Sequence, residues 1–212
     1  MHLDFLIEDV SGKTMLEILL PKVLPENVSY RVHYYKGVGR IPEKMRSAKE
    51  IKGRQLLDNL PRLLNGFGRT YQAWGESYKG HVIVICDLDD KSFNEFLAQL
   101  NHLLDWCKMA PETSICLAIE EGEAWFLGDA KALFSAYPHA KKQVLATYKQ
   151  DSICGTWEKL AEVVGFEYKN KSYQEVGLKK REWAEKITPY MEIKNNKSLS
   201  FQHLITEIKS II

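Results

Sequence analysis

The segment HVIVIC, residues 81–86, constrains the fold more than any other part of the chain. It is a continuous apolar run, and it ends abruptly in the acidic sequence DLDD, residues 87–90. Strands of a parallel sheet are covered on both faces and are apolar throughout, whereas half-exposed strands alternate apolar and polar residues. The run therefore predicts a central strand of a parallel sheet that is covered on both faces.

Other segments predict the remaining strands and their helices. LDFLI (3–7) and TSICLAI (113–119) are short apolar runs, and VSYRVHYY (28–35) alternates with β-branched and aromatic residues, so each predicts a strand. Apolar residues at helical spacing predict helices over 11–24 and 93–107. Because strands and helices alternate, we expect an α/β fold with a mostly parallel sheet flanked by helices.

The pattern divides the chain into an α/β core, residues 1–130, and a C-terminal helical cap, residues 131–212. In the second part, short helical segments are separated by proline and glycine, and no strong strand pattern occurs. The polar turn NNKS, residues 195–198, precedes the last helix. With 212 residues and 45% hydrophobic content, the chain suits one globular α/β domain, and we expect the cap to pack on the sheet.

Charge and hydropathy limit where the protein acts and what it contacts. The formal net charge is +1, so contact with nucleic acid requires a local basic patch. No run approaches the roughly 18 apolar residues of a membrane helix, and the N-terminus lacks the layout of a signal peptide. We therefore expect a cytoplasmic protein without membrane contact. The four cysteines show no C-x-x-C spacing, which argues against a zinc site or a disulfide framework.

A polar, glycine-dotted insertion, residues 36–80, contains a local excess of cations. One interpretation is an ordinary solvated surface, because runs of charge are common there. The other is contact with a phosphate backbone. In the second case, the candidate contacts are Lys36, Arg40, Lys44 and Arg46.

The stretch FLIEDVSGKTM, residues 5–15, contains Gly12-Lys13-Thr14 before a predicted helix, as a phosphate-binding P-loop does. The first glycine of that motif is replaced by Ile7. Glu8 and Asp9 would also repel phosphate oxygens at close range. These departures exclude the nucleotide-binding loop and leave a carboxylate, Glu8, at the end of the first strand.

Acidic residues follow three of the predicted strands at the edge where open α/β sheets build their sites. They are Glu8, then Asp87, Asp89 and Asp90, and then Glu120, Glu121 and Glu123. Taken singly, each has an ordinary interpretation, such as Asp90 as a helix cap or Glu123 in the first turn of a helix. Jointly they would repel one another unless a cation lies among them. Hard oxygen ligands suit Mg²⁺ or Mn²⁺, and in an extended D-x-D both Asp87 and Asp89 would face one ion.

These residues resemble the TOPRIM domain of primases, topoisomerases and OLD-family nucleases, in which a glutamate follows the first strand and D-x-D follows a later one. LAIEEGEAWFLGD (117–129) is similar to a segment of the small stand-alone TOPRIM-like proteins that accompany AAA- or ABC-type ATPases in bacterial defence loci. GLKKREWAEKITPYM (177–191) and NNKSLSF (195–201) resemble the C-terminal region of that group.

The resemblance implies a role for each matching residue. Glu8 would act as general acid or base, and Asp87, Asp89 and Glu123 would hold Mg²⁺ with Glu8. Lys180, in a G-x-x-K-x-x-W setting, would be the late lysine of the OLD nucleases. Two ions about 4 Å apart would then stabilise the attacking water and the leaving oxygen when a phosphodiester is cleaved. Relatives commonly carry a second acid where this chain has Gly12, so Asp9 or Glu17 would have to replace it or one ion would be lost.

We therefore expect a Mg²⁺-dependent TOPRIM-like phosphodiesterase or nuclease that acts on nucleic acid in anti-phage defence, with an ATPase as partner. The alternative is a non-catalytic TOPRIM-like module that docks to an ATPase or to a phage component. A third interpretation, a phosphorylated acidic pocket like that of response regulators, would need a lysine after a later strand, where this chain has acids.

Overall fold

The fold is built on a parallel sheet, and the computed structural model describes residues 1–42, 53–151 and 155–212. Within these ranges, the strands are β1 (His2–Ile7), β2 (Ser29–Tyr34), β3 (Gly80–Asp87) and β4 (Thr113–Ala118). They form one all-parallel sheet in the order β2-β1-β3-β4. The predicted α/β class and the four predicted strands are confirmed.

Burial explains why the strands have these sequences. Residues 82–86 of β3 are fully buried, because β3 lies inside the sheet and helices cover both of its faces. β2 is an edge strand, and only Val32 of its residues is buried. Its alternating sequence reflects that exposure, as expected for a strand with one solvated side.

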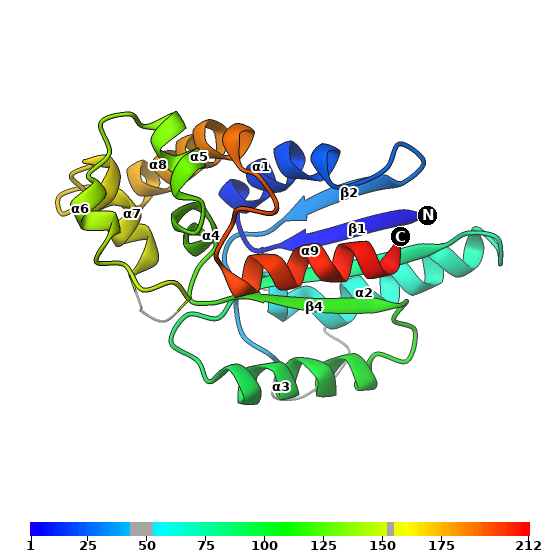
Figure 1. Cartoon of the computed structure of the whole chain (residues 1–212). Coiled ribbons are helices and arrows are strands. Elements are labelled where there is room, and N and C mark those ends of the chain that lie inside the picture. Colours follow the sequence, from blue (N-terminus) through cyan, green and yellow to red (C-terminus); the bar gives the residue numbers. More distant parts are fainter. Residues whose placement is uncertain (43–52, 152–154) are drawn as a thin grey trace.

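Helices cover both faces of the sheet (Figure 1). One face packs against α1 (Val10–Leu19) and α9 (Leu199–Ile211), and the other packs against α2 (Leu56–Ala73) and α3 (Phe93–Trp106). The other helical elements lie toward the carboxyl ends of the strands or beside α1: η1 (Leu20–Lys22), α4 (Glu123–Leu127), α5 (Ala130–Ala136), α6 (Lys142–Leu145), α7 (Thr156–Val164), α8 (Tyr173–Ile187) and η2 (Thr188–Tyr190). The region after residue 130 is helical in its described parts, as predicted. Over the described ranges, no helix has the length and apolar character that crossing a membrane requires.

The strand order places a crevice at the carboxyl edge of the sheet. β1 has β2 on one side and β3 on the other, so the connections leave β1 and β3 in opposite directions. In open α/β sheets, ligands bind at such a switch point, outside the carboxyl ends of the strands. The register aligns Ile7 with both Tyr34 and Ile85, so the residues that follow each strand emerge together.

Candidate functional site

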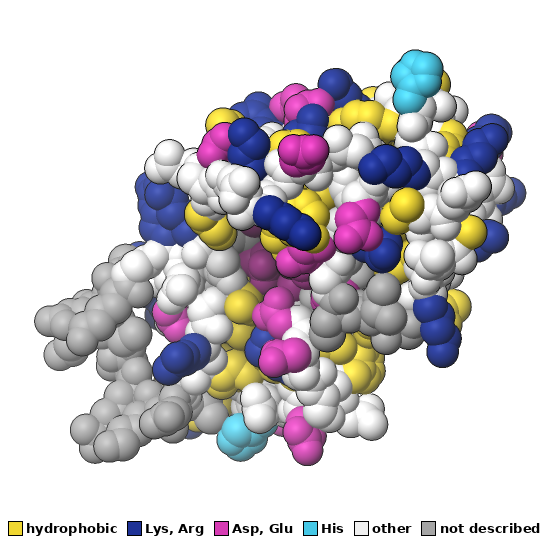
Figure 2. Space-filling view, turned by 90° about the vertical axis from the view of Figure 1, so that its left-hand side faces the viewer, with side chains coloured by type: hydrophobic (Ala, Val, Ile, Leu, Met, Phe, Trp, Pro, Cys, Tyr) yellow, Lys and Arg dark blue, Asp and Glu magenta, His cyan; other side chains and the backbone are white. Residues whose placement is uncertain are grey.

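Four carboxylates line a small pocket at the switch point between β1 and β3. They are Glu8, Asp9, Asp87 and Glu123, and the apolar wall includes Met15 and Trp125. Figure 2 looks onto this edge of the sheet and shows acidic side chains gathered in a central hollow. The cavity volume is about 20 Å³, enough for one or two particles of the size of water. The pocket therefore suits an ion or a water molecule, and an organic substrate would have to lie outside it.

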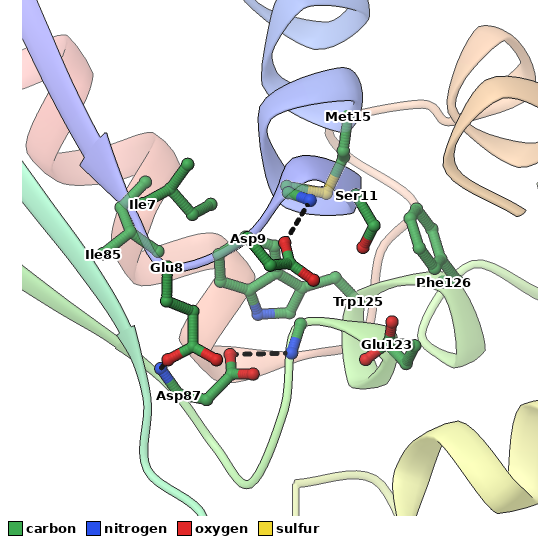
Figure 3. Close-up of a pocket in the computed structure, with 12 residues that line it drawn as sticks. Ile7, Glu8, Asp9, Ser11, Met15, Ile85, Asp87, Glu123, Trp125 and Phe126 are labelled. Atoms are coloured by element: carbon green, nitrogen blue, oxygen red, sulfur yellow. Dashed lines mark hydrogen bonds between the residues drawn. The ribbon is translucent and has the colours of Figure 1, made fainter. Parts of the chain in front are cut away.

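Glu8 and Asp87 form the centre of the site. Their carboxyl groups lie side by side (Figure 3), and the backbone amide of Asp87 donates to Glu8 Oε2 at 3.4 Å. Asp87 Oδ1 accepts from the amide of Gly122 at 3.0 Å. Burial, followed by the neighbouring charge of Asp9, raises the pKa of Glu8 to about 7. Burial and the charge of Glu8 raise the pKa of Asp87 well above its usual value.

Glu123 enters the site from the first turn of α4 and is held by a lysine of α8. Lys180 Nζ lies 3.3 Å from Glu123 Oε2 and 3.5 Å from Glu121 Oε1. Burial raises the pKa of Glu123 to about 7, although the ammonium group of Lys180 lowers it in part. Burial alone would lower the pKa of Lys180, but the surrounding carboxylates outweigh it and raise that pKa. The structure thus brings together Glu8, Asp87, Glu123 and Lys180, which are distant in sequence.

Asp89 does not line the pocket, although its charge adds to the raised pKa of Glu8. Strand β3 ends at Asp87, and Asp89 has a φ of 51°, so the extended D-x-D geometry that we expected does not continue to it. Its side chain is 43% exposed and pairs with Lys91, with 2.7 Å between Nζ and Oδ2. The expected extended D-x-D geometry is therefore wrong for this structure, because the chain turns directly after the strand. Asp89 as a ligand of the ion stays a prediction.

Of the two acids that could replace the one missing at Gly12, Asp9 lies in the pocket as a helix cap and Glu17 lies outside it. Asp9 lines the pocket, but its Oδ1 accepts from the amide of Gly12 at 2.7 Å and caps the N-terminus of α1. Glu17 does not line the pocket, and its half-exposed side chain lies 3.5 Å from Lys13.

Two acids after β4 have roles that the sequence analysis left open. Glu120 accepts from the amide of Thr156 at 3.0 Å, and Glu121 accepts from the amide of Trp157 at 3.1 Å. Together they bind the N-terminus of α7. Glu120 has a φ of 61° and accepts through its carbonyl from the amide of Asp89, which also has a positive φ. Strained residues of this kind cluster at functional sites.

Two of the four predicted nucleic-acid contacts, Lys36 and Arg40, lie on the β2 side of the same edge. Lys36 is exposed just after β2, and its amide donates to the carbonyl of Arg54 at 2.8 Å. The amide of Arg40 donates to Asp58 at 3.0 Å, and its side chain is exposed. Lys44 and Arg46 lie outside the described residues.

Comparison with known proteins identifies a family. Residues 7–209 match the family model described as "Domain of unknown function (DUF4276)". The chain belongs to the DUF4276 family. No curated protein and no solved structure matches it. The matched region of this DUF4276 protein includes Glu8, Asp87, Glu123 and Lys180, so the whole site lies within the part of the chain that defines the family.

The carboxylates of the DUF4276 site suit a divalent cation that takes only two protein ligands. In the described part of the chain, no three Asp, Glu, His or Cys side chains are grouped closely enough to hold a metal ion by themselves. Mg²⁺, however, keeps several waters and is commonly held by one or two carboxylates together with substrate phosphates. Glu8 and Asp87 provide such a pair, and burial together with the neighbouring carboxylates raises the pKa of both.

Proposed function

We propose that this DUF4276 protein is a Mg²⁺- or Mn²⁺-dependent phosphodiesterase that cleaves nucleic acid at the carboxyl edge of its sheet. One observation carries the proposal: Glu8 after β1, Asp87 at the end of β3 and Glu123 after β4 converge with Lys180 at the switch point of the sheet. The TOPRIM-like residue pattern supports the same reaction class. That this protein is related to the TOPRIM domain is also part of the proposal.

Each residue has a chemical role in this proposal. Glu8 and Asp87 would hold the cation, which when bound would neutralise phosphate charge and lower the pKa of a water molecule. By the TOPRIM resemblance Glu8 would also act as the general acid or base. Its pKa is raised to about 7 in the metal-free site, and a bound cation would lower that pKa. Lys180 orients Glu123 and supplies positive charge next to the place where phosphate oxygens would lie.

A non-catalytic binding module is the second candidate, and one observation favours it. Gly12 stands where many TOPRIM-like relatives carry a second acid, and Asp9 is engaged as a helix cap. A site reduced in this way could bind a cation without cleaving a substrate. The ATPase partner and the role in phage defence stay predictions from the resemblance, and co-purification with an ATPase from a neighbouring gene would test them.

The decisive experiment combines cleavage with metal binding. The wild-type protein, Asp87→Asn and a matched control, Asp90→Asn, are incubated with supercoiled plasmid or tRNA in Mn²⁺, and Mn²⁺ uptake is measured by calorimetry. Asp90 belongs to the same acidic run but is exposed and does not line the pocket. We expect cleavage and uptake in the wild type and the control, and loss of both in Asp87→Asn.

Two other outcomes would revise the proposal. Uptake without cleavage by any of the three proteins would favour the binding module. If Asp87→Asn takes up Mn²⁺ as the control does, the acidic pocket is not the metal site and the proposal fails.

A further inference from the structure

A second and larger cavity lies beside the acidic pocket. It has a volume of about 310 Å³ and lies between the end of β2 and the first half of α2. Tyr34, Lys36, Arg54 and Arg62 line it, together with Tyr35 and Asn59. We call this the cationic cavity.

The cations of this cavity differ from most lysines near the acidic pocket. Lys180 and Lys91 each pair with a carboxylate. Among the described residues, no carboxylate forms an ion pair with the side chains of Lys36, Arg54 or Arg62. Like charges gathered around one cavity repel one another, and an anion bound among them relieves that repulsion. Arginine matches the geometry of phosphate oxygens, so phosphate is the anion that this set suits.

Aromatic groups accompany the cations. Tyr34 is 46% exposed although it is large and aromatic, and Lys13 Nζ of α1 lies 5.3 Å from the centroid of its ring, which leaves the other face of the ring for a base. Tyr35 lies beside it in the lining. Burial raises the pKa of Tyr35 to about 12, so its ring stays neutral at physiological pH. Exposed aromatic rings next to a basic groove stack on unpaired bases, whichever base is present. A nucleotide carries both a phosphate group and a planar base, so it matches the cations and the aromatic ring of this lining.

The size of the cavity limits what can enter it. Ligand pockets begin at about 300 Å³, so this one has room for a single small ligand and not for a double helix. Bases in single strands and at ends can leave the stack and enter a protein pocket, whereas bases inside a duplex are already stacked and paired.

The cationic cavity is joined to the acidic pocket through the backbone. The amide of Tyr35 donates to the carbonyl of Ile7 at 3.0 Å, and the amide of Gly37 donates to the carbonyl of Glu8 at 2.8 Å. We propose that the cationic cavity binds one unpaired nucleotide, with Lys36, Arg54 and Arg62 on its phosphate and Tyr34 against its base. This inference rests on the proposed function, since it makes single-stranded nucleic acid the substrate that lies next to the acidic pocket.

Binding without cleavage tests the inference. Fluorescence anisotropy in EDTA measures the affinity for a labelled oligothymidylate, a labelled oligouridylate and a labelled duplex of the same length. Unlabelled AMP, dTMP and inorganic phosphate serve as competitors. The variants are Arg54→Ala with Arg62→Ala, Tyr34→Leu, and the matched control Arg69→Ala. Arg69 is exposed on the same helix and does not line the cavity.

We expect the single strands to bind more tightly than the duplex. The double arginine variant should lose about tenfold or more in affinity and lower the salt dependence by about one unit of slope for each lost phosphate contact. Tyr34→Leu should lose at least about fivefold through base stacking. Arg69→Ala should bind as the wild type does. Because all these side chains are exposed, the variants should keep the wild-type circular dichroism spectrum.

The competitors identify the source of the nucleotide. AMP or dTMP displacing the oligonucleotide, together with weak binding of the oligonucleotide by the double arginine variant, would show that free nucleotides also enter the cavity. That result supports the proposed nucleotide site. Equal affinity for single strand and duplex, or equal affinity of the double variant and Arg69→Ala, overturns the inference. If the wild-type protein binds single strands but cleaves no nucleic acid, only the proposed function fails. If the wild-type protein cleaves nucleic acid and the cavity variants bind single strands as tightly as it does, only the proposed nucleotide site fails.

Discussion

The protonation of a buried carboxyl group depends on the groups that donate to it, and two aspartates of this chain show the contrast. Asp4 accepts from Tyr71 and contacts a ring nitrogen of His33, each at 2.6 Å. Asp87, at the opposite edge of the sheet, accepts one backbone amide and faces Glu8. Burial raises the pKa of both groups, but the hydrogen bonds of Asp4 outweigh burial and lower its pKa. Asp4 is therefore stabilised as an anion, whereas burial and the charge of Glu8 disfavour the anionic form of Asp87 in spite of the charge of Lys180.

Asp4→Asn should test this contrast by removing a stabilised charge. We expect the free energy of unfolding at pH 7 to fall by about 2 kcal/mol, because hydrogen bonds to a charged acceptor are lost. The pKa of Asp4 is lower in the folded protein than in the unfolded chain. Its contribution is therefore fully present above the unfolded pKa and is lost as pH falls through the folded value. Urea unfolding between pH 7 and pH 3 should show the difference from wild type shrinking with acid.

The control for this experiment is Asp105→Asn, which changes an exposed aspartate of α3. Its free energy of unfolding should stay within about 0.5 kcal/mol of wild type. A difference between Asp4→Asn and wild type that is as large at pH 3 as at pH 7 would show that Asp4 acts through packing and not through its charge.

Among the elements, those with the strongest local patterns could be predicted from the sequence and α2 could not. The strands were predictable because buried parallel strands are continuous apolar runs. In α2, the buried leucines share a helix with Pro61, Gly66 and Gly68, so the sequence predicts a polar insertion of loop and helix without fixing where the helix begins and ends. Because α2 was not placed, Arg62 was not recognised as a neighbour of Lys36.

In the candidate site, too, the residues that follow a strong local pattern could be predicted, and the contacts between distant segments could not. Glu8, Asp87 and Glu123 could be predicted because parallel strands end at one edge, and Lys180 could be predicted only from the family resemblance. The turn that moves Asp89 away and the binding of the α7 N-terminus by Glu120 and Glu121 could not be predicted. These contacts join segments far apart in the chain, and no periodicity in the sequence encodes them.

The glycines of α2 provide a test of how this helix packs. A Cβ on Gly68 would lie 1.4 Å from the carbonyl oxygen of Met109, so the helix touches the backbone between α3 and β4. A Cβ on Gly66 would meet nothing within 4 Å. Gly66→Ala should raise the free energy of unfolding by about 0.5–1 kcal/mol, because alanine favours the helix. Gly68→Ala should lower it by about 2 kcal/mol or more, because one element must move.

Chemical denaturation of both glycine variants measures these changes in the free energy of unfolding. The pair is informative because the change in sequence is identical and both positions lie in the same helix. If both variants are stabilised, α2 does not lie against the 109–110 backbone as described.

At the scale of the whole molecule, one buried cluster extends across residue 130, where the sequence pattern changes from the α/β core to the helical cap. This cluster contains Phe5 of β1 and Ile85 of β3 together with Trp125, Trp183 and Phe201 from the helices beyond the sheet. Helix α9 crosses back and packs on β4 (Figure 1), and Trp125 Nε1 donates to Ser200 Oγ at 2.9 Å. Since the same apolar surface is shared, the sheet and the C-terminal helices should unfold together.

Phe201→Ala tests this cooperativity, with Leu199→Ala as its matched control on the same helix. Phe201 is fully buried and packs edge to face on Trp125, whereas Leu199 is 76% exposed. Removing the Phe201 ring should lower the free energy of unfolding by about 3–5 kcal/mol, and Leu199→Ala should change it by less than about 0.5 kcal/mol. Far-UV circular dichroism reports the whole fold, and tryptophan fluorescence includes Trp125 and Trp183 of the shared cluster together with the chain's other three tryptophans. In urea, the two signals should move together in Phe201→Ala, since loss of the α9 contact releases the sheet as well. Separate transitions, with fluorescence lost at lower urea than circular dichroism, would show that the C-terminal helices form an independent unit.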